Sequence, residues 1–294
     1  MRSPRTLHAP AKINLTLEVL RKRPDGYHGI RSVMVPVGLY DELLIEPSRD
    51  GPQLRCDRPE LEGDDNLVLR AFRALDPPER RWCLTLRKRI PIQAGLGGGS
   101  SDAAAVLLAG MQGLFGPPAS RDVLVIARSL GSDVPFFLAG TAALVEGTGE
   151  RVVPAGALPP WYAVIVVPPV AVSTARAYAA LDDHERPLRP RADSLSLRAL
   201  AALQRGDFEA VVRLLSNDFH DVVTAAHPVI ARAAAAFADA GVRCSLSGSG
   251  SALFALARDR TEADRIAERL PLDADHRVEI APFVSSAEWA EWTR

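Results

Sequence analysis

A run of glycines that leads directly into an alanine-rich segment is the strongest constraint on how this chain folds. The run spans residues 95–99 (GLGGG), and Ser100, Ser101, Asp102 and three alanines follow it. Glycines let a backbone approach a ligand closely and adopt positive φ angles. The first N–H groups of the following helix lack partners within the helix and lie at the positive end of its dipole. The segment therefore predicts a cradle for a di- or triphosphate.

Other glycine-rich phosphate motifs do not fit this loop. A Walker A loop needs a lysine directly after the last glycine, and none follows Gly99 here. A protein-kinase loop would be accompanied by HRD and DFG segments, and a dinucleotide loop by an acidic residue about twenty positions on. A flexible linker that happens to precede a helix is the structural alternative, although the abrupt change into Ser-Ser-Asp and alanines argues against it.

Composition narrows the class of partner. The length of 294 residues suits one large domain or two of ordinary size. Hydrophobic residues make up 47% of the chain, which is enough for a core. The formal net charge is −1, whereas nucleic-acid binding draws most of its affinity from a basic excess, so we expect no nucleic-acid partner. Cys56, Cys83 and Cys244 lie far apart, which favours reduced core thiols. No apolar run reaches about 18 residues, so we expect no membrane contact and a cytoplasmic location.

Hydrophobic periodicity predicts a mixture of strands and helices. Alternation over residues 13–20 predicts a half-buried strand with Ile13, Leu15, Leu17 and Val19 on one face, followed by a turn at residues 24–26. Further strands are expected over 33–39, 41–46, 82–87, 134–138, 142–146, 164–167, 243–246, 252–257 and 278–282. Helices are expected over 66–75, 103–108, 121–130, 262–270 and most of 173–240, with a loop at 187–190.

This order of elements predicts α+β layers and two domains. Strands and helices do not alternate regularly, as they would in a parallel βαβ fold. Residues 154–160 are rich in proline, glycine and alanine, which is typical of a boundary. We therefore expect domains over residues 1–157 and 158–294, with a cleft between them.

Three segments together carry a family resemblance. Residues 91–104 (PIQAGLGGGSSDAA) resemble the phosphate-binding loop of the GHMP superfamily, which comprises galactokinase, homoserine kinase, mevalonate kinase and phosphomevalonate kinase. Residues 10–15 (PAKINL) resemble the N-terminal motif of that superfamily, and residues 247–250 (SGSG) its C-terminal glycine motif. The third motif usually continues with glycine, whereas Ser251 and Ala252 follow here, so the exact contact of this turn stays open.

Four segments narrow the resemblance to one family of the superfamily. They are residues 9–15 (APAKINL), 23–28 (RPDGYH), 65–67 (DNL) and 131–137 (GSDVPFF). Their combination resembles the 4-diphosphocytidyl-2-C-methyl-D-erythritol kinases of the non-mevalonate isoprenoid pathway. The resemblance implies ATP- and Mg²⁺-dependent phosphorylation of the 2-hydroxyl of this cytidine-diphosphate sugar alcohol, giving the 2-phosphate and ADP. It also implies a ribosomal-protein-like N-terminal α/β sandwich, a ferredoxin-like C-terminal domain, and an active site between them.

The resemblance assigns roles to individual residues. Asp133 matches the catalytic aspartate, which accepts or orients the proton of the acceptor hydroxyl, and Lys12 matches the lysine that stabilises the developing charge. By pattern alone, Asp133 would be a turn residue before a predicted strand and Lys12 a solvent-facing lysine. The ATP site would comprise Pro91, Ile92, Gln93, Ala94, Gly95, Leu96, Gly97, Gly98, Gly99, Ser100, Ser101 and, with less support, Asn66. The metal ligands stay unknown, with Ser101 and the phosphates as candidates.

The acceptor site follows from the same resemblance. Tyr27 and His28 hold the positions of the cytosine-binding aromatic ring and histidine, and stacking plus edge hydrogen bonds is what base recognition requires. Tyr178 is the candidate for the second stacking ring, and Asn14 and Thr174 are expected near the sugar alcohol and its phosphates. Without the resemblance, the Tyr27-His28 pair would be part of an ordinary hairpin and Tyr178 a core-packing tyrosine.

Three rival functions remain at this stage. Another kinase of the superfamily would have no cytosine to hold, so the DGYH segment argues against it. A non-catalytic sensor would not need both Lys12 and Asp133. An RNA-binding protein is suggested only by analogy of fold, and the neutral charge opposes it. Whether the protein is a monomer or a homodimer is not encoded in these patterns.

Overall fold

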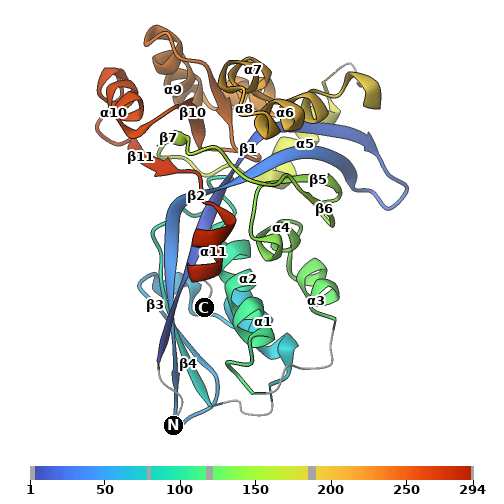
Figure 1. Ribbon diagram of the computed structural model, residues 1–294, viewed down its shortest axis with the longest axis vertical. Helices are drawn as coiled ribbons and strands as arrows, with labels where there is room; N and C mark the ends of the chain where they lie inside the picture. The colour runs from blue at the N-terminus through green and yellow to red at the C-terminus, as the bar shows by residue number, and fades with distance from the viewer. Residues whose placement is uncertain (1–3, 78–80, 117–121, 185–189, 293–294) are drawn as a thin grey trace.

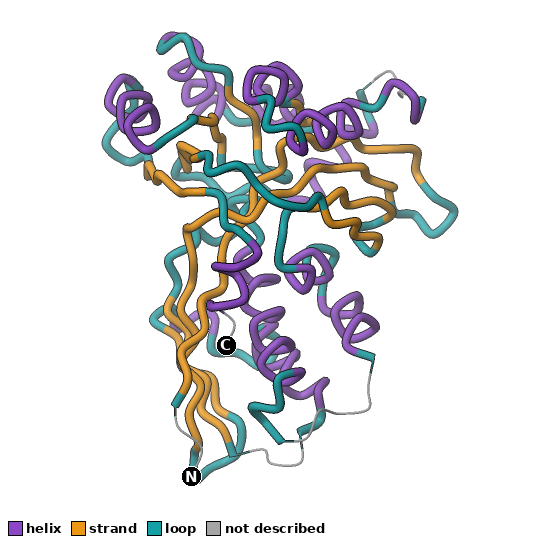
Figure 2. Tube along the Cα trace, in the orientation of Figure 1, coloured by secondary structure: helices purple, strands orange, loops and turns teal. Residues whose placement is uncertain are grey.

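The computed structural model describes residues 4–77, 81–116, 122–184 and 190–292 and contains two sheets (Figures 1 and 2). The larger sheet has seven strands in the path β3-β4-β2-β1-β8, with β5 pairing both β2 and β6; the smaller has the order β11-β7-β10-β9. The strands of the larger sheet are β1 (Arg5–Lys22), β2 (His28–Pro47), β3 (Gln53–Cys56), β4 (Trp82–Arg87), β5 (Ala143–Gly147), β6 (Arg151–Pro154) and β8 (Ser216–Asn217). Those of the smaller are β7 (Tyr162–Val167), β9 (Cys244–Leu246), β10 (Leu253–Ala257) and β11 (Arg277–Pro282). The expected α+β class is confirmed.

The long antiparallel ribbon of β1 and β2 runs through both halves of the molecule (Figure 1). Its register shifts at three points, one of them between Asn14 and Thr16. A bulge of this kind reverses which face the following side chains occupy. Ile13 and Leu15 accordingly belong to one apolar core, whereas Leu17 and Val19 belong to the other.

The prediction of a half-buried strand over residues 13–20 is therefore wrong in one respect. The polar residues of this stretch, Asn14, Thr16 and Glu18, are also buried. Helices and the second sheet cover the face that the alternating pattern would leave in water. Residues 33–39 and 41–46 also form one continuous strand, β2, instead of two.

Four helices pack beside the lower part of the large sheet (Figure 1). They are α1 (Leu67–Leu75), α2 (Gly98–Met111), α3 (Val123–Leu130) and α4 (Val134–Ala139). Asn66 and Asp122 accept hydrogen bonds from helix N–H groups and so cap α1 and α3. The strand expected over 134–138 is wrong, because this segment is α4. Pro135 suits the first turn of a helix, Gly140 ends it in the left-handed conformation, and a short apolar run does not distinguish strand from helix.

In the second half of the chain, the described residues form seven helices. They are α5 (Thr174–Asp182), α6 (Leu195–Gln204), α7 (Phe208–Leu214), α8 (His220–Ala226), α9 (Pro228–Asp239), α10 (Arg260–Arg269) and α11 (Ser286–Trp292). Short 3₁₀ turns lie at Pro59–Leu61 and Arg191–Asp193. Most of the loop expected at 187–190 lies outside the described residues. No helix in the described part of the chain is long and apolar enough to cross a membrane.

The two halves of the chain exchange elements. β8 pairs in parallel with β1 of the large sheet, although it lies more than 190 residues further along the sequence. After β11, the chain returns to the first half as α11, where Trp289 stacks near Phe137 with ring centroids 6.1 Å apart. Trp292 approaches Tyr40 of β2 at 5.1 Å. The division at residue 157 stays a prediction, and it would separate segments that are interlocked.

The three cysteines are free thiols. Cys83 is buried, whereas Cys56 and Cys244 are only half-buried. The expectation of core positions therefore holds for one of the three. Burial raises the pKa of the Cys244 thiol to about 11, which keeps it protonated at neutral pH.

The docking of α11 can be tested by removing its buried ring. Trp289→Ala deletes a side chain that is 6% exposed and packs on Phe137 and Gly140. We expect the free energy of unfolding to fall by about 3–5 kcal/mol, as for other buried aromatic truncations. Urea denaturation of this variant and of Glu291→Ala, an exposed change on the same helix, measures the difference. Equal stability of the two variants would show that α11 does not stabilise the fold.

Candidate active site

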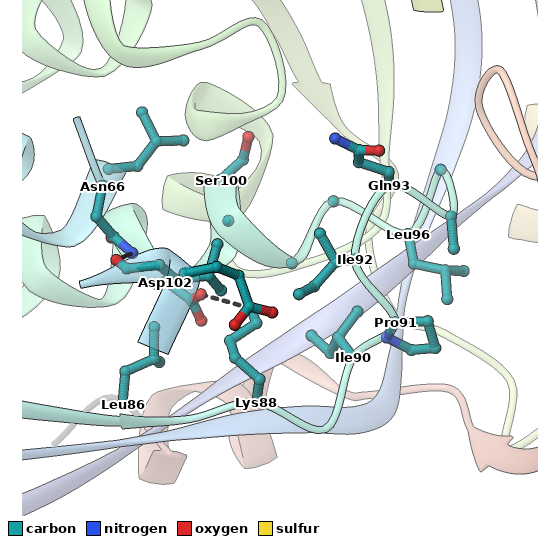
Figure 3. Close-up of a pocket in the computed structure, with 18 of the residues that line it drawn as sticks. Asn66, Leu86, Lys88, Ile90, Pro91, Ile92, Gln93, Leu96, Ser100 and Asp102 are labelled. Carbon is teal, nitrogen blue, oxygen red and sulfur yellow. Dashed lines mark hydrogen bonds and ion pairs between the residues drawn. The ribbon is translucent and has the colours of Figure 1, made fainter. Parts of the chain in front are cut away.

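The glycine-rich loop forms one wall of a cavity of about 400 Å³ between β4, α1 and α2 (Figure 3). The loop residues that line it run from Pro91 to Ser100 without a gap, together with Asn66, Leu86, Lys88, Ile90 and Asp102. Every residue predicted for the ATP site therefore lines this cavity except Ser101, which is buried behind it. The amide oxygen of Asn66 caps α1 by accepting from Val68 N, and its nitrogen donates to the Leu61 carbonyl. Both ends of this amide therefore have partners within the protein.

The glycine-rich loop ends at the uncapped N-terminus of α2. Gly97 precedes α2 with φ +73°, and no side chain caps the helix among the described residues. A Cβ atom at Gly97 would come within 3.0 Å of the Phe137 ring and 3.1 Å of Lys12 Cγ, so only glycine fits. The uncapped N–H groups and the dipole of this 14-residue helix favour an anion at this end, and the phosphate site itself stays a prediction.

The C-terminal glycine motif packs directly against this loop. The Ser247 hydroxyl donates to the Gly95 carbonyl at 2.9 Å, and Ala252 N donates to the Ala94 carbonyl at 3.0 Å. Gly95 has φ +76°, and a Cβ atom there would lie 2.0 Å from the Ser247 carbonyl oxygen. The contact left open by the change to Ser251 and Ala252 is thus a backbone hydrogen bond through Ala252.

Asn14 joins three parts of the site through one side chain. Its Oδ1 accepts hydrogen bonds from Lys12 Nζ at 2.6 Å and from Gly248 N at 2.8 Å. Its Nδ2 donates to Ser32 Oγ on β2 at 2.8 Å. A single amide therefore fixes the lysine of β1, the C-terminal glycine turn and β2 relative to one another. Sequence patterns gave no sign that Asn14 would bond Lys12 or Gly248, and its predicted place near the sugar alcohol stays a prediction.

Asp133, the residue directly before α4, faces Lys12. Their charged atoms lie 3.8 Å apart, and the Asp133 side chain is 29% exposed whereas that of Lys12 is 4% exposed. Asp133 makes no capping hydrogen bond to α4, so its carboxylate can accept from a ligand. Burial lowers the pKa of the Lys12 ammonium, and the Asp133 carboxylate opposes that shift.

A buried charge cluster that the sequence did not reveal lies beneath the glycine-rich cavity. Lys88 Nζ contacts Asp41 at 2.5 Å and Asp102 at 2.7 Å, and Figure 3 shows the Lys88–Asp102 contact. Burial raises the pKa of Asp102 to about 7; Lys88 opposes this shift and Asp41 adds to it. Asp41 also accepts hydrogen bonds from the backbone N–H groups of Arg89 and Ile90. These bonds fix the segment between β4 and the glycine-rich loop. The acidic residue Asp41 in an apolar stretch of β2 was the sequence feature that could have indicated this cluster.

A second cavity of about 400 Å³ lies on the other side of the loop. Gln93 and Gly95 line both cavities, and Thr174, Ser249 and Gly250 line only the second. The Thr174 and Ser249 hydroxyls are 2.8 Å apart. Thr174 is therefore next to the C-terminal glycine turn, and its expected place near the sugar alcohol and its phosphates stays a prediction.

The two rings predicted to enclose cytosine, Tyr27 and Tyr178, have different surroundings. Tyr27 is 68% exposed, and Tyr178 stacks on His28 with ring centroids 5.4 Å apart and planes at 17°. The side chain of His28 is 7% exposed. The structure therefore brings His28 and Tyr178 together and leaves Tyr27 in solvent, and the enclosure of cytosine stays a prediction.

Comparisons with known proteins place this geometry in a class. The family model of the GHMP kinases N-terminal domain matches residues 66–141, and the GHMP kinases C-terminal model matches residues 199–274. A homoserine kinase structure from Cytophaga hutchinsonii shares the fold with a TM-score of 0.69 at 22% identity, covering 97% of this chain and 96% of that one. The fold and the two glycine turns are thus those of a GHMP kinase, an ATP-dependent enzyme class.

More similar relatives define the family within this class. The 4-diphosphocytidyl-2-C-methyl-D-erythritol kinase of Symbiobacterium thermophilum is 43% identical over 90% of this chain and 95% of its own length. That of Deinococcus radiodurans is also 43% identical, over 89% and 87%. A crystal structure of 4-(cytidine 5'-diphospho)-2C-methyl-D-erythritol kinase matches with a TM-score of 0.77 at 38% identity, covering 95% of this chain and 98% of that one. The chain belongs to the 4-diphosphocytidyl-2-C-methyl-D-erythritol kinase family.

The contact between the two glycine turns generates a prediction. Gly95→Ala combines a positive φ with a Cβ atom that overlaps the Ser247 carbonyl, whereas Gly206→Ala has φ +67° and no atom within 4 Å. Backbone strain of about 1–3 kcal/mol is common to both variants. We expect only Gly95→Ala to displace the loop, with kcat/KM for ATP at least tenfold below that of Gly206→Ala, which corresponds to about 1.4 kcal/mol. Steady-state kinetics with equal values for the two variants would contradict the close packing of these turns.

Proposed function

We propose that this enzyme transfers the γ-phosphoryl group of ATP to the 2-hydroxyl of 4-diphosphocytidyl-2-C-methyl-D-erythritol. The products would be the 2-phosphate and ADP, in the non-mevalonate route to isoprenoid precursors. The observation that carries the proposal is the facing pair of Lys12 and Asp133 beside two interlocked glycine turns. The relatives that bear this enzyme name, over most of the chain, support the choice of acceptor.

The catalytic pair would act on the acceptor hydroxyl. The carboxylate of Asp133 would accept or orient the hydroxyl proton, because it is partly exposed and not used to cap α4. Lys12 would stabilise negative charge on the transferring group from a position fixed by Asn14. Burial strengthens such an interaction, because little water screens it. Positioning and charge stabilisation are the main requirements of phosphoryl transfer.

ATP would bind with its phosphates at the N-terminus of α2. The uncapped helix end, the Gly97 conformation and the cavity bounded by residues 91–100 support this placement. The side chain of Ser101 fits a role near Mg²⁺, because its hydroxyl is buried and has no hydrogen-bond partner in the described part of the chain. Mg²⁺ would neutralise charge on the ATP phosphates. Residues Pro91 to Ser100 would contact the nucleotide, with Asn66 at the rim of the cavity.

The acceptor would extend from the catalytic pair toward the turn between β1 and β2. Thr174 beside Ser249, together with Asn14, would contact the sugar alcohol and its phosphates. Cytosine would lie at Tyr27, His28 and Tyr178, where closure over the base would bury the exposed Tyr27 ring. We place the reaction in the cytoplasm, in a monomer or homodimer, with the ATP and acceptor sites at the junction of residues 1–157 and 158–294.

The proposed reaction is tested by measuring ADP release by purified protein with Mg²⁺ and ATP. Parallel reactions contain 4-diphosphocytidyl-2-C-methylerythritol, mevalonate, homoserine or galactose. We expect turnover only with the cytidine compound, and mass spectrometry of the product should show one added phosphate. Turnover with another acceptor would retain the kinase and overturn the acceptor, whereas no turnover with any of them would favour a sensor.

The base role of Asp133 makes a quantitative prediction. Asp133→Ala and the isosteric Asp133→Asn should each lower kcat by about 10²- to 10⁴-fold, because general-base catalysis contributes that range. ATP binding, measured by calorimetry, should be unchanged, since Asp133 does not line the glycine-rich cavity. Near-normal turnover of Asp133→Asn would remove the base role from the mechanism.

A further inference from the structure

The imidazole of His28 has a protein oxygen close to each of its nitrogen atoms. Nδ1 lies 3.0 Å from the Leu20 carbonyl oxygen of β1, and Nε2 lies 2.8 Å from Asp182 Oδ1 at the end of α5. A carbonyl oxygen and a carboxylate oxygen can only accept hydrogen bonds. Each ring nitrogen of His28 therefore lies beside an acceptor oxygen, and the carboxylate of Asp182 supplies the one from α5.

α5 holds this ring with two side chains spaced by four residues. Residues at positions i and i+4 lie on the same face of a helix, so Tyr178 and Asp182 both reach His28. Tyr178 covers the face of the imidazole, and Phe219 supports Tyr178 edge-on with centroids 4.8 Å apart. Lys22 of β1 contacts the same Asp182 carboxylate at 3.0 Å. Lys22 and His28, on either side of the β1–β2 turn, thus both contact one carboxylate of α5.

The other end of α5 lies at the glycine turns. Ser173 caps the helix, and the Thr174 hydroxyl contacts that of Ser249. Thr174, Tyr178 and Asp182 follow one another at four-residue intervals, so they line one face of the helix. With a rise of about 1.5 Å per residue, this face spans about 12 Å. α5 therefore connects the phosphoryl-transfer end of the proposed acceptor site with its base-binding end.

We propose that Asp182 is a positioning residue that fixes His28, and with it the base-binding end of the acceptor site, at a set distance from the catalytic pair. α5 would then select acceptors by length, because the base is held at one end and the sugar alcohol at the other. This inference rests on the proposed function, since it assumes an acceptor that carries a cytidine group. The side chain of Asp182 touches neither the reacting atoms nor the base, and it acts through His28.

The test compares two neighbouring aspartates. Asp182→Asn removes the negative charge that His28 and Lys22 share, while Asp183→Asn changes an exposed residue whose side chain forms no hydrogen bond or ion pair within the described residues. For each variant and the wild type, we would measure kcat, KM for the cytidine acceptor, KM for ATP, and binding of cytidine monophosphate by calorimetry. Thermal denaturation verifies that each variant is folded.

We expect Asp182→Asn to raise KM for the cytidine acceptor about tenfold and to weaken cytidine monophosphate binding by a similar factor. The values of kcat and of KM for ATP should stay within twofold of wild type, and Asp183→Asn should match wild type throughout. Asp182→Glu, which restores the charge, should recover part of the lost affinity. ¹⁵N NMR of the His28 ring should show a changed Nε2 environment in Asp182→Asn and the wild-type environment in Asp183→Asn.

Several results would overturn the inference. Equal cytidine monophosphate binding by Asp182→Asn and Asp183→Asn would contradict it even if the wild type is fully active. A parallel rise in KM for both substrates of Asp182→Asn would show a general structural effect. Absence of wild-type turnover with intact, Asp182-dependent cytidine monophosphate binding would overturn the proposed reaction alone, and absence of any cytidine monophosphate binding would overturn both.

Discussion

The amide side chain of Asn14 is the interaction on which the rest of this site depends. Its oxygen accepts from Lys12 and from the backbone of Gly248, and its nitrogen donates to Ser32. Gly248 belongs to the turn that packs on the phosphate loop through Ser247 and Gly95. One buried amide thus sets the position of a lysine, two glycine turns and two strands. A buried polar group without partners is costly, so this network is stable only when all members are in place.

The cost of burying charge explains much of the architecture around Asn14. The Lys12 side chain is 4% exposed, and Asp133 together with the Asn14 oxygen compensates part of its lost hydration. Beneath the glycine-rich cavity, Lys88 lies between Asp41 and Asp102 in a similarly dry environment. Both clusters lie beside the phosphate loop, where a highly charged ligand would bind. Rigid charged groups stabilise a transferring phosphoryl group without the reorganisation that water would need.

Sequence patterns predicted the parts of this structure that depend on local chemistry. Periodicity predicted β4 and α1, and the glycine run before the alanines predicted the loop and α2. The family resemblance singled out Lys12 and Asp133, which face each other. The patterns failed where distant contacts decide the outcome. Segment 134–138 is too short for periodicity to separate helix from strand, and the bulge at Asn14 depends on the pairing of β1 with β2. The Lys88 cluster joins residues that are distant in sequence, and so do the contacts of Tyr178 and Asp182 with His28.

The most direct measurement of this account is the single-turnover rate of phosphoryl transfer in Asn14→Leu. Leucine has a similar volume but accepts no hydrogen bond, so Lys12 and the Gly248 N–H would lose their shared acceptor. We predict a rate constant at least about 10²-fold below wild type, the range for loss of a preorganised charge-stabilising group, with calorimetric ATP binding reduced far less. A folded Asn14→Leu variant with a single-turnover rate within a fewfold of wild type would contradict the central role of this amide.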